Sequence, residues 1–265
     1  FLATQFFPKD VAEKVMVLYA FVRIPDEYVD NPAPGSDPKA LLTTWKESWL
    51  ETIETGKSSE WAQQAMYDIH VEHNIPWEYS IDFIDAMISD INFAQPDTYT
   101  DLQKYMYGSA EVVGILMTYI VGFKGDAIPY AKLLGEAMQL GNFLRDIGED
   151  YRDRGRIYIP KEIFGVYGIA ENDIALGKVT QNWRTCMQYL ITKNRELYQQ
   201  ANQGIQLLAP HAQKPVLFAS AMYEEILKEI EKSDYDVFSK RNRVSKLGKI
   251  WCILKVLWNK KQLGL

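Results

Sequence analysis

Cysteine is scarce in this sequence: the 265 residues include only Cys186 and Cys252, which lie far apart. That spacing predicts neither a disulfide framework nor a cysteine-based zinc site, and it suits a reducing cytosol. The chain also lacks any run of about 20 apolar residues, the length that crosses a bilayer. The first residues show neither the basic leader nor the cleavage site of a signal peptide. These absences predict a cytoplasmic protein without a membrane span.

Strand patterns are equally scarce. No alternating apolar and polar run of useful length appears, whereas almost every segment has apolar residues at helical spacing. No linker, low-complexity run or internal repeat divides the chain, so we expect one all-α domain over residues 1–265. Ser59 is expected to cap one helix, and Thr100 or Asp101 another. The predicted helices cover residues 11–29, 38–55, 59–73, 76–93, 100–121, 128–151, 180–208 and 215–233, with an irregular piece at 152–177.

Charge is unevenly distributed along the chain. The formal net charge is −6, but the segment from Val237 onward contains eight Lys or Arg residues and no Asp or Glu. The rest therefore has 29 − 8 = 21 basic and 35 acidic residues, or −14. An acidic body argues against a nucleic-acid partner. The segment 246–261 mixes lysine, tryptophan and aliphatic residues, which suits contact with an anionic membrane surface. A docked terminal helix with a solvated basic edge is the alternative.

An acidic stripe follows the predicted helix 128–151 and continues just past its end. Its polar residues recur at steps of three or four and therefore share one face. The other sides of this helix are mostly apolar, which is typical of a buried helix. Buried carboxylates are costly unless they are paired or bound to a cation. The stripe, which otherwise would be a solvated face, thus predicts a metal-binding cavity lined by Gln139, Asn142, Asp146, Asp150 and Asp153.

The first predicted helix repeats the same spacing, because Asp26 and Asp30 are four residues apart like Asp146 and Asp150. If both helices face one cavity, several carboxylates meet there, and only divalent cations make that arrangement tolerable. Ligands that are all oxygen select Mg²⁺ or Mn²⁺ over zinc. His70 and His73 lack the third ligand that a zinc site needs.

Arginines accompany both acidic pairs. Arg23 lies one turn before Asp26, and Arg145 adjoins Asp146. Guanidinium groups bind phosphate oxygens in a fixed fork, so carboxylates, metal and arginine together indicate a diphosphate site. Departure of diphosphate leaves a carbocation, which aromatic faces can stabilise. The aromatic candidates for this role, each of which could instead be a core residue, are Phe1, Tyr19, Tyr105, Tyr107 and Tyr223.

The motifs resemble those of the squalene/phytoene synthase family. Arg23-Ile-Pro-Asp26-Glu-Tyr-Val-Asp30 and Gln139-x-x-Asn142-x-x-Arg145-Asp146-x-x-Glu149-Asp150 are similar to its two acidic motifs. The segment 105–114 is similar to its middle motif, and 221–223 and 237–241 are similar to its C-terminal motifs. Glu111 departs from the pattern, because many members have glycine or serine there.

This resemblance implies an isoprenoid-synthase-type helical bundle around a central cavity. It also implies head-to-head condensation of two prenyl diphosphates through a cyclopropyl diphosphate intermediate. The implied magnesium ligands are Asp26, Asp30, Asn142, Asp146 and Asp150. The residues implied to contact the substrates or their diphosphates are Phe1, Tyr19, Arg23, Gln139, Arg145, Tyr223 and Arg241. Tyr105 is implied to lie near the second ionisation.

Several functions stay open within and beyond this resemblance. Phytoene synthesis from two twenty-carbon diphosphates is favoured over dehydrosqualene synthesis from two fifteen-carbon ones. Squalene synthesis needs NADPH, which we do not expect as a cofactor. Some relatives are non-catalytic assembly factors, but these lose acidic residues that this chain retains. Head-to-tail elongases and terpene cyclases favour Asp-Asp-x-x-Asp, which is absent, as are P-loop and serine-hydrolase motifs.

Overall fold

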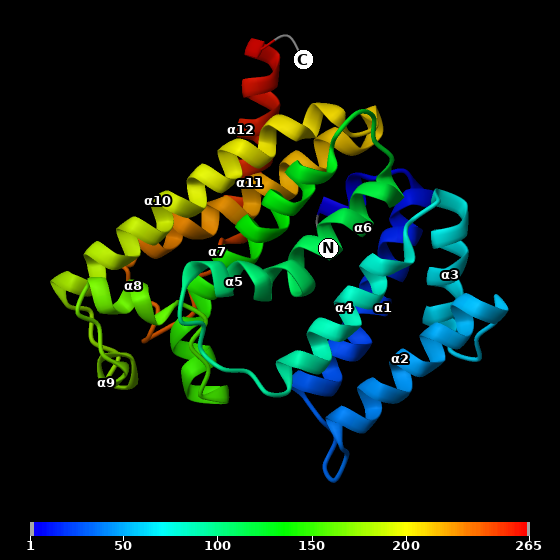
Figure 1. Ribbon diagram of the computed structural model, residues 1–265. Helices are drawn as coiled ribbons and strands as arrows, with labels where there is room; N and C mark the ends of the chain where they lie inside the picture. Colours follow the sequence, from blue (N-terminus) through cyan, green and yellow to red (C-terminus); the bar gives the residue numbers. More distant parts are fainter. Residues whose placement is uncertain (1–2, 264–265) are drawn as a thin grey trace.

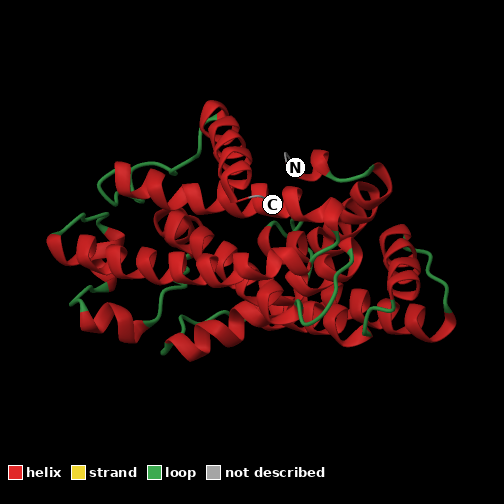
Figure 2. Ribbon diagram, turned by 90° about the horizontal axis from the view of Figure 1, so that it is seen from above, coloured by secondary structure: helices red, strands yellow, loops and turns green. Residues whose placement is uncertain are grey.

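The computed structural model describes residues 3–263, and describes side chains as far as Trp258. Phe1, a predicted substrate contact, therefore lies outside the described residues. The described part consists of helices joined by loops and contains no β-strand, only an isolated bridge between Phe123 and Leu208 (Figures 1 and 2). The prediction of an all-α fold is confirmed. Within these residues, no helix combines the length and the apolar character needed to span a bilayer.

Twelve α-helices are described, together with three short helices of other types. The α-helices are α1 (Lys9–Asp30), α2 (Pro38–Thr55), α3 (Trp61–His73), α4 (Trp77–Asp90), α5 (Tyr99–Met106), α6 (Val112–Val121), α7 (Ile128–Arg154), α8 (Lys161–Val166), α9 (Glu171–Ala175), α10 (Gln181–Gln203), α11 (Pro210–Lys232) and α12 (Lys246–Leu263). The short ones are 3₁₀ helices η1 (Ala3–Phe6) and η3 (Gly204–Leu207) and the π-helical turn η2 (Tyr107–Glu111).

The two larger apolar cores flank the centre of the molecule, and a third, small cluster contains Val11, Val121, Leu208 and Ala212. One joins α7, α10 and α11 around buried residues such as Trp183 and Leu227. The other joins α1 to α4 with α6 around residues such as Phe21 and Trp49. Helix α7 contacts both α10 and α6, so it lies between the two cores (Figure 1). Because α7 carries the acidic stripe, this position brings the stripe to the middle of the fold.

Some helix ends that were predicted from capping residues and prolines are wrong. Thr98 caps α5 in a capping box with Asp101, so Thr100 is not the cap. Glu60, rather than Ser59, occupies the N-cap of α3 and makes no side-chain cap hydrogen bond. Helix α11 begins at Pro210 rather than at Pro215, because proline at the first helical position has no intrahelical N–H bond to lose. Pro215 lies inside the helix, where it forgoes one backbone hydrogen bond. The stretch predicted as irregular contains α8 and α9.

The predicted helix 100–121 is interrupted by η2, where it approaches α4 closely. A Cβ atom built on Gly108 would lie 2.4 Å from the Ala86 Cβ, so only glycine fits this crossing. A π-turn adds one residue to the helical turn and commonly marks a functional site. Here the turn directs Ser109 and Ala110 toward the central cavity.

Helices α6 and α7 also touch backbone to backbone. A Cβ atom on Gly114 would lie 2.6 Å from the Ala131 carbonyl oxygen, and one on Gly135 would lie 2.7 Å from the Ala110 carbonyl oxygen. Both glycines line the cavity. The absence of their side chains therefore sets both the helix spacing and the shape of the cavity wall.

Candidate active site

A cavity of about 1340 Å³ occupies the centre of the molecule. Its wall comes from η1, α1, α4, α5, η2, α6, α7, α10, η3, α11 and α12, together with loop residues that include the segment 241–244. Carboxylates and guanidinium groups surround one part of it, and the remainder is mainly apolar. The apolar lining includes Val15, Leu18, Val22, Phe83, Val113, Met117, Leu134, Met138, Leu208, Val216, Met222 and Ile226.

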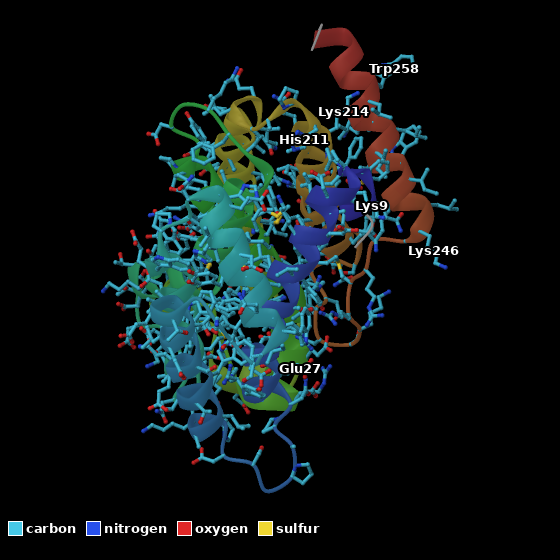
Figure 3. The ribbon with its side chains drawn as sticks, turned by 90° about the vertical axis from the view of Figure 1, so that its right-hand side faces the viewer. Lys9, Glu27, His211, Lys214, Lys246 and Trp258 are labelled. Atoms are coloured by element: carbon cyan, nitrogen blue, oxygen red, sulfur yellow. The ribbon has the colours of Figure 1, made fainter. Side chains whose placement is uncertain are left out.

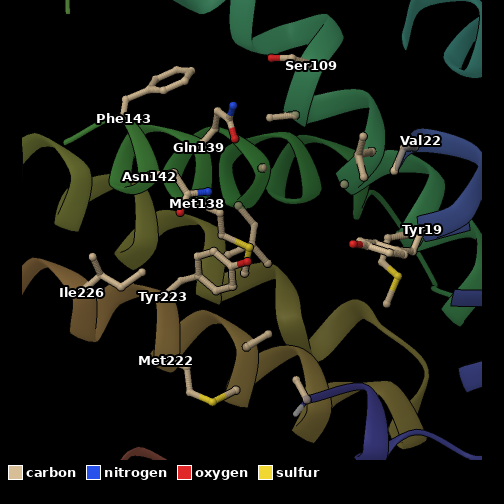
Figure 4. Close-up of a pocket in the computed structure, with 18 of the residues that line it drawn as sticks. Tyr19, Val22, Ser109, Met138, Gln139, Asn142, Phe143, Met222, Tyr223 and Ile226 are labelled. Carbon is tan, nitrogen blue, oxygen red and sulfur yellow. The ribbon is translucent and has the colours of Figure 1, made fainter. Parts of the chain in front are cut away.

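The polar stripe of α7 faces this cavity, as its periodicity predicts. Gln139 and Asn142 lie on the wall with Tyr223 of α11 nearby and Tyr19 of α1 on another side (Figure 4). The remaining members of the stripe, Asp146, Asp150 and Asp153, line the same cavity. Residues three or four apart on a helix lie above one another, so the stripe continues along the cavity for several turns.

The acidic pair of α1 meets the stripe of α7 at this cavity. Asp26 and Asp30 both line it. Arg154 connects the two helices, because its guanidinium donates to Asp30 at 2.9 Å and lies 3.7 Å from an oxygen of Asp150. The two carboxylate pairs therefore share one cavity and one arginine.

Negative charge in this group is only partly compensated. Burial, and then Asp146, raises the pKa of Asp150 to about 6. Burial also raises the pKa of Asp26, with Asp30 adding to the shift, and burial raises the pKa of Asp30. A raised carboxylate pKa means that the surroundings disfavour the ionised form. A cation entering the cavity would relieve this cost.

Asp146 differs from these three acids because two arginines hold it. Arg145 donates to both carboxylate oxygens at 2.7 and 2.5 Å, and Arg241 donates to the same two oxygens at 2.9 and 2.8 Å. Arg241 also lies 3.3 Å from Glu149. The loop that carries Arg241 is attached to α7 by a second bond, in which Arg152 donates to the Phe238 carbonyl at 2.8 Å. Arg23 similarly pairs with Asp26 and Glu27 on α1.

An aromatic group closes another side of the cavity. The Tyr105 hydroxyl donates to Asp90 at 2.8 Å, and Arg156 donates to the other Asp90 oxygen at 2.7 Å. Tyr158 stacks on Phe143, with ring centroids 4.1 Å apart and planes at 8°. Burial, and then Asp90, raises the pKa of Tyr105 well above its usual value, so this phenol stays protonated. Tyr105, Phe143 and Tyr158 all line the cavity, and the hydrogen bond to Asp90 fixes the orientation of Tyr105.

The predicted site residues can now be located. Twelve of the residues implied to bind metal or substrate, or to lie near the reaction, line the cavity: Tyr19, Arg23, Asp26, Asp30, Tyr105, Gln139, Asn142, Arg145, Asp146, Asp150, Tyr223 and Arg241. Tyr107, an aromatic candidate, does not belong to the described lining, and its hydroxyl donates to Asp82 at 2.8 Å. Sequence reasoning gave no role to Asp90 or Arg154. A single acid at a helix end and an arginine among other charges carry no distinctive spacing.

The histidine pair has a structural role instead. His70 is buried, stacks on Trp77 with centroids 4.6 Å apart, and has its pKa lowered to about 4 by burial. Its Nδ1 lies 3.1 Å from the Ile75 carbonyl, which it can reach as a donor. In the described part of the chain, no group of three His, Cys, Asp or Glu side chains is arranged closely enough to hold a metal ion.

The acidic residues nevertheless fit a hard divalent cation. Their donor atoms are carboxylate and amide oxygens, which Mg²⁺ prefers. Arginines now neutralise part of the negative charge that such a cation would otherwise neutralise, and the raised pKa values of Asp26, Asp30 and Asp150 show that this neutralisation is incomplete. Asp26 and Asp30 on α1, and Asn142, Asp146 and Asp150 on α7, are the residues that would hold the ion.

Glu111 provides a test of electrostatics outside the cavity. Burial, and then Glu136, raises the pKa of Glu111 to about 7. Because the folded state holds this proton more tightly than the unfolded state, stability should fall as pH rises from about 4.5 to 7. Glu111→Gln should therefore raise the free energy of unfolding at pH 8 by about 1 kcal/mol, after discounting for solvent around a half-exposed side chain, and change it little at pH 4. Urea denaturation at both values measures this, with exposed Glu51→Gln as the control. An equal effect at both pH values would contradict the assignment.

The fold and the cavity define a class of protein: an all-α bundle that encloses a mainly apolar chamber beneath paired acidic motifs. The model of the squalene/phytoene synthase family matches residues 1–248. The chain belongs to the squalene/phytoene synthase family.

Individual relatives agree with this assignment. The chain is 33% identical over 267 residues to a phytoene synthase of Arthrospira platensis, covering 96% of this chain and 86% of that protein. It is 32% identical over 269 residues to a 15-cis-phytoene synthase of Synechococcus elongatus, covering 97% and 86%. Among solved structures, a dehydrosqualene synthase in complex with ligand is 28% identical, with a TM-score of 0.91 and coverage of 98% and 91%. A squalene synthase of Alicyclobacillus acidocaldarius is 26% identical, with a TM-score of 0.82 and coverage of 88% of each chain.

Proposed function

We propose that this protein is a phytoene synthase, which condenses two geranylgeranyl diphosphates head to head. The observation that carries the proposal is the meeting of the acidic pairs of α1 and α7, with their arginines, beside one large apolar chamber. Relatives bearing the name phytoene synthase, at 32–33% identity over nearly the whole chain, support the same reaction. The intact acidic motifs argue against a non-catalytic assembly factor.

The chamber suits the size of the proposed substrates. Forty carbon atoms occupy roughly 1200 Å³ at about 30 Å³ each, the share of one water-sized group in a liquid. The cavity of about 1340 Å³ admits chains of this total length. Apolar walls bury the prenyl tails, while the charged part of the cavity binds the diphosphates. Burial of the tails away from water orients both substrates in the same direction.

The residues of this chain divide the work of the reaction. Arg23, Arg145 and Arg241 supply forked donors for diphosphate oxygens. The carbocation left by departing diphosphate is captured by the double bond of the second chain. Loss of a proton from the resulting cation then closes the cyclopropane ring of the cyclopropyl diphosphate intermediate. The ring faces of Tyr105, Phe143 and Tyr158 lie beside the chamber, where they stabilise cationic carbon and exclude water.

Magnesium is the proposed cofactor, and Mn²⁺ is the alternative. Held by Asp26, Asp30, Asn142, Asp146 and Asp150, it would neutralise the charge that diphosphate acquires as it leaves. NADPH is not part of the proposal, because the product forms by loss of a proton rather than by reduction. Contact of the basic segment from Val237 onward with a membrane surface stays a prediction.

Dehydrosqualene synthase is the second candidate, because a solved dehydrosqualene synthase matches the fold with a TM-score of 0.91. Incubation with fifteen-carbon or twenty-carbon diphosphate, Mg²⁺ and detergent, with and without NADPH, separates the two by product identification. We expect phytoene from the twenty-carbon substrate, independent of NADPH and abolished by a chelator. A dominant thirty-carbon product would overturn the phytoene proposal, and absence of any condensed product would overturn the enzymatic one.

A further inference from the structure

Helix α12 has two apolar sides rather than one. Its first apolar side packs on α11, with Cys252 buried and Val256 half-buried there. These residues are four apart and therefore share one face. The helix leads away from the body at one edge of the molecule, with Trp258 at its far end (Figures 1 and 3).

The second apolar side of α12 faces outward. Six large apolar side chains recur along it at steps of three or four and are 42–78% exposed: Leu247, Ile250, Trp251, Leu254, Leu257 and Trp258. At 100° per residue, these positions fall within one arc about 120° wide. We call these six residues the outer stripe. Soluble surfaces rarely expose so many contiguous apolar side chains without a partner.

Lysines border the outer stripe. Lys246 and Lys255 are exposed on α12, and the whole segment from Val237 onward contains no acidic residue. Glu27, which belongs to the acidic motif of α1, is at the end of the molecule opposite Trp258 (Figure 3). Charge is thus divided along the chain, with only basic charges from Val237 onward and a net charge of −14 in the rest, although Glu225 of α11 lies near the packed side of α12.

We propose that the outer stripe docks α12 on an anionic membrane surface. Tryptophan and aliphatic side chains enter the headgroup boundary, while lysine stems extend past them to anionic headgroups. A second copy of this chain is a poorer occupant, because stacking two stripes would bring lysines of both copies together, and like charges at an interface are costly. Each lysine near an anionic surface instead gains attraction.

Docking in this orientation would place the cavity close to lipid. Lys249 on α12 and Val244 just before it both line the cavity. This step depends on the proposed function, whose product is a hydrocarbon without a diphosphate group. Transfer of such a hydrocarbon into water is unfavourable. A cavity rim continuous with a membrane-docked helix gives that product a direct route into the bilayer.

Vesicle flotation with the full chain tests the proposal. Wild-type protein is mixed with vesicles of phosphatidylcholine alone or with 30% phosphatidylglycerol, in the absence of substrate. We expect binding to the anionic vesicles and at least about tenfold weaker binding to the neutral ones, with salt lowering the affinity. Trp251→Ser/Leu254→Ser/Trp258→Ser should lower the partition coefficient for anionic vesicles at least about tenfold. Lys246→Gln/Lys255→Gln should lower it by a few-fold and reduce its salt dependence.

A matched control removes exposed apolar side chains elsewhere. Trp61, Val166 and Leu176 are 63%, 79% and 58% exposed and lie outside α12. Their triple change to serine should leave vesicle binding unaltered. Equal binding by wild type and the stripe variant, or equal binding to neutral and anionic vesicles, would overturn the proposal. The proposal would also be overturned if the wild-type protein does not bind vesicles, forms a dimer by light scattering, and becomes monomeric when the stripe residues are changed. Product formation in detergent tests the proposed function independently of membrane binding, because that assay contains no vesicles.

Discussion

Replacing Asp150 with asparagine should make the protein more stable and much less active at the same time. The pKa of this carboxyl is raised to about 6 by burial and by Asp146, so the ionised side chain destabilises the metal-free fold at neutral pH. Removing its charge should increase the free energy of unfolding by about 1 kcal/mol at pH 8. This figure is smaller than the full pKa shift of Asp150 would give, because solvent screens a partly buried carboxylate. Turnover should fall at least about a hundredfold, because a proposed oxygen ligand and its charge are lost.

Asp146→Asn is the informative companion, because the same change one turn away should have the opposite effect on stability. Asp146 accepts four hydrogen bonds from Arg145 and Arg241. Loss of its charge leaves two arginines poorly paired and should cost about 1–2 kcal/mol, since hydrogen bonds to charged groups are the stronger ones. Activity should fall as for Asp150→Asn.

Urea denaturation in EDTA and steady-state turnover with Mg²⁺ measure the two effects separately. A thermal shift with Mg²⁺ plus a non-hydrolysable prenyl diphosphate adds a binding readout, because ligands that bind only the folded state raise its stability. Both variants should lose most of that shift. Asp68→Asn, at an exposed acid on α3, serves as the control for loss of one carboxylate. Full turnover in Asp150→Asn, or a loss of stability equal to that of Asp146→Asn, would contradict the electrostatic description.

Gly135→Ala should destabilise the fold by about 2–4 kcal/mol, because backbone atoms occupy the space that the new methyl group needs. This is near the upper end of the destabilisation usually seen when a side chain is enlarged at a closely packed position. Its Cβ would lie 2.7 Å from the Ala110 carbonyl oxygen and 3.0 Å from the Glu111 Cα. Neither atom belongs to a side chain that can rotate away, so α7 must move relative to η2. Since Gly135 lines the cavity, the same movement should lower turnover.

Gly165→Ala provides the comparison for that variant. Gly165 lies in α8, and no heavy atom lies within 4 Å of the Cβ position there. Alanine should therefore be neutral or stabilising by about 0.5–1 kcal/mol, the ordinary difference between these residues in a helix. Urea midpoints of the two variants give the contrast directly. Equal midpoints would mean that η2 and α7 have room to separate.

Periodicity was enough to predict the helical class and the shared face of Asp146 and Asp150, because both follow from local geometry. That Asp26 and Asp30 lie at the same cavity followed from an energetic argument, in which buried carboxylates need a common cation. Their role as metal ligands stays a prediction. Helix boundaries were less accessible: Thr98 and Asp101 form the capping box, but Thr100 and Asp101 compete as caps when only residue type is considered.

The arginine partners could not have been predicted from the sequence. Arg154 reaches Asp30 across 124 residues of chain, and Arg241 reaches Asp146 across 95. No local pattern encodes such pairings, which depend on how whole helices pack. The outer stripe was hidden for a different reason. A helix with apolar residues on two opposite sides shows weak amphipathic character, although each side alone is distinct.

The long separation between Asp146 and Arg241 has a consequence for biosynthesis. A ribosome adding about 5–20 residues per second needs roughly 5–20 s to make the intervening 95 residues. During that time the nascent chain already contains α7 with its row of carboxylates, while one of its two guanidinium partners does not yet exist. The loop that completes the site is thus translated well after α7, and stable closure of the acidic chamber must follow translation of Arg241.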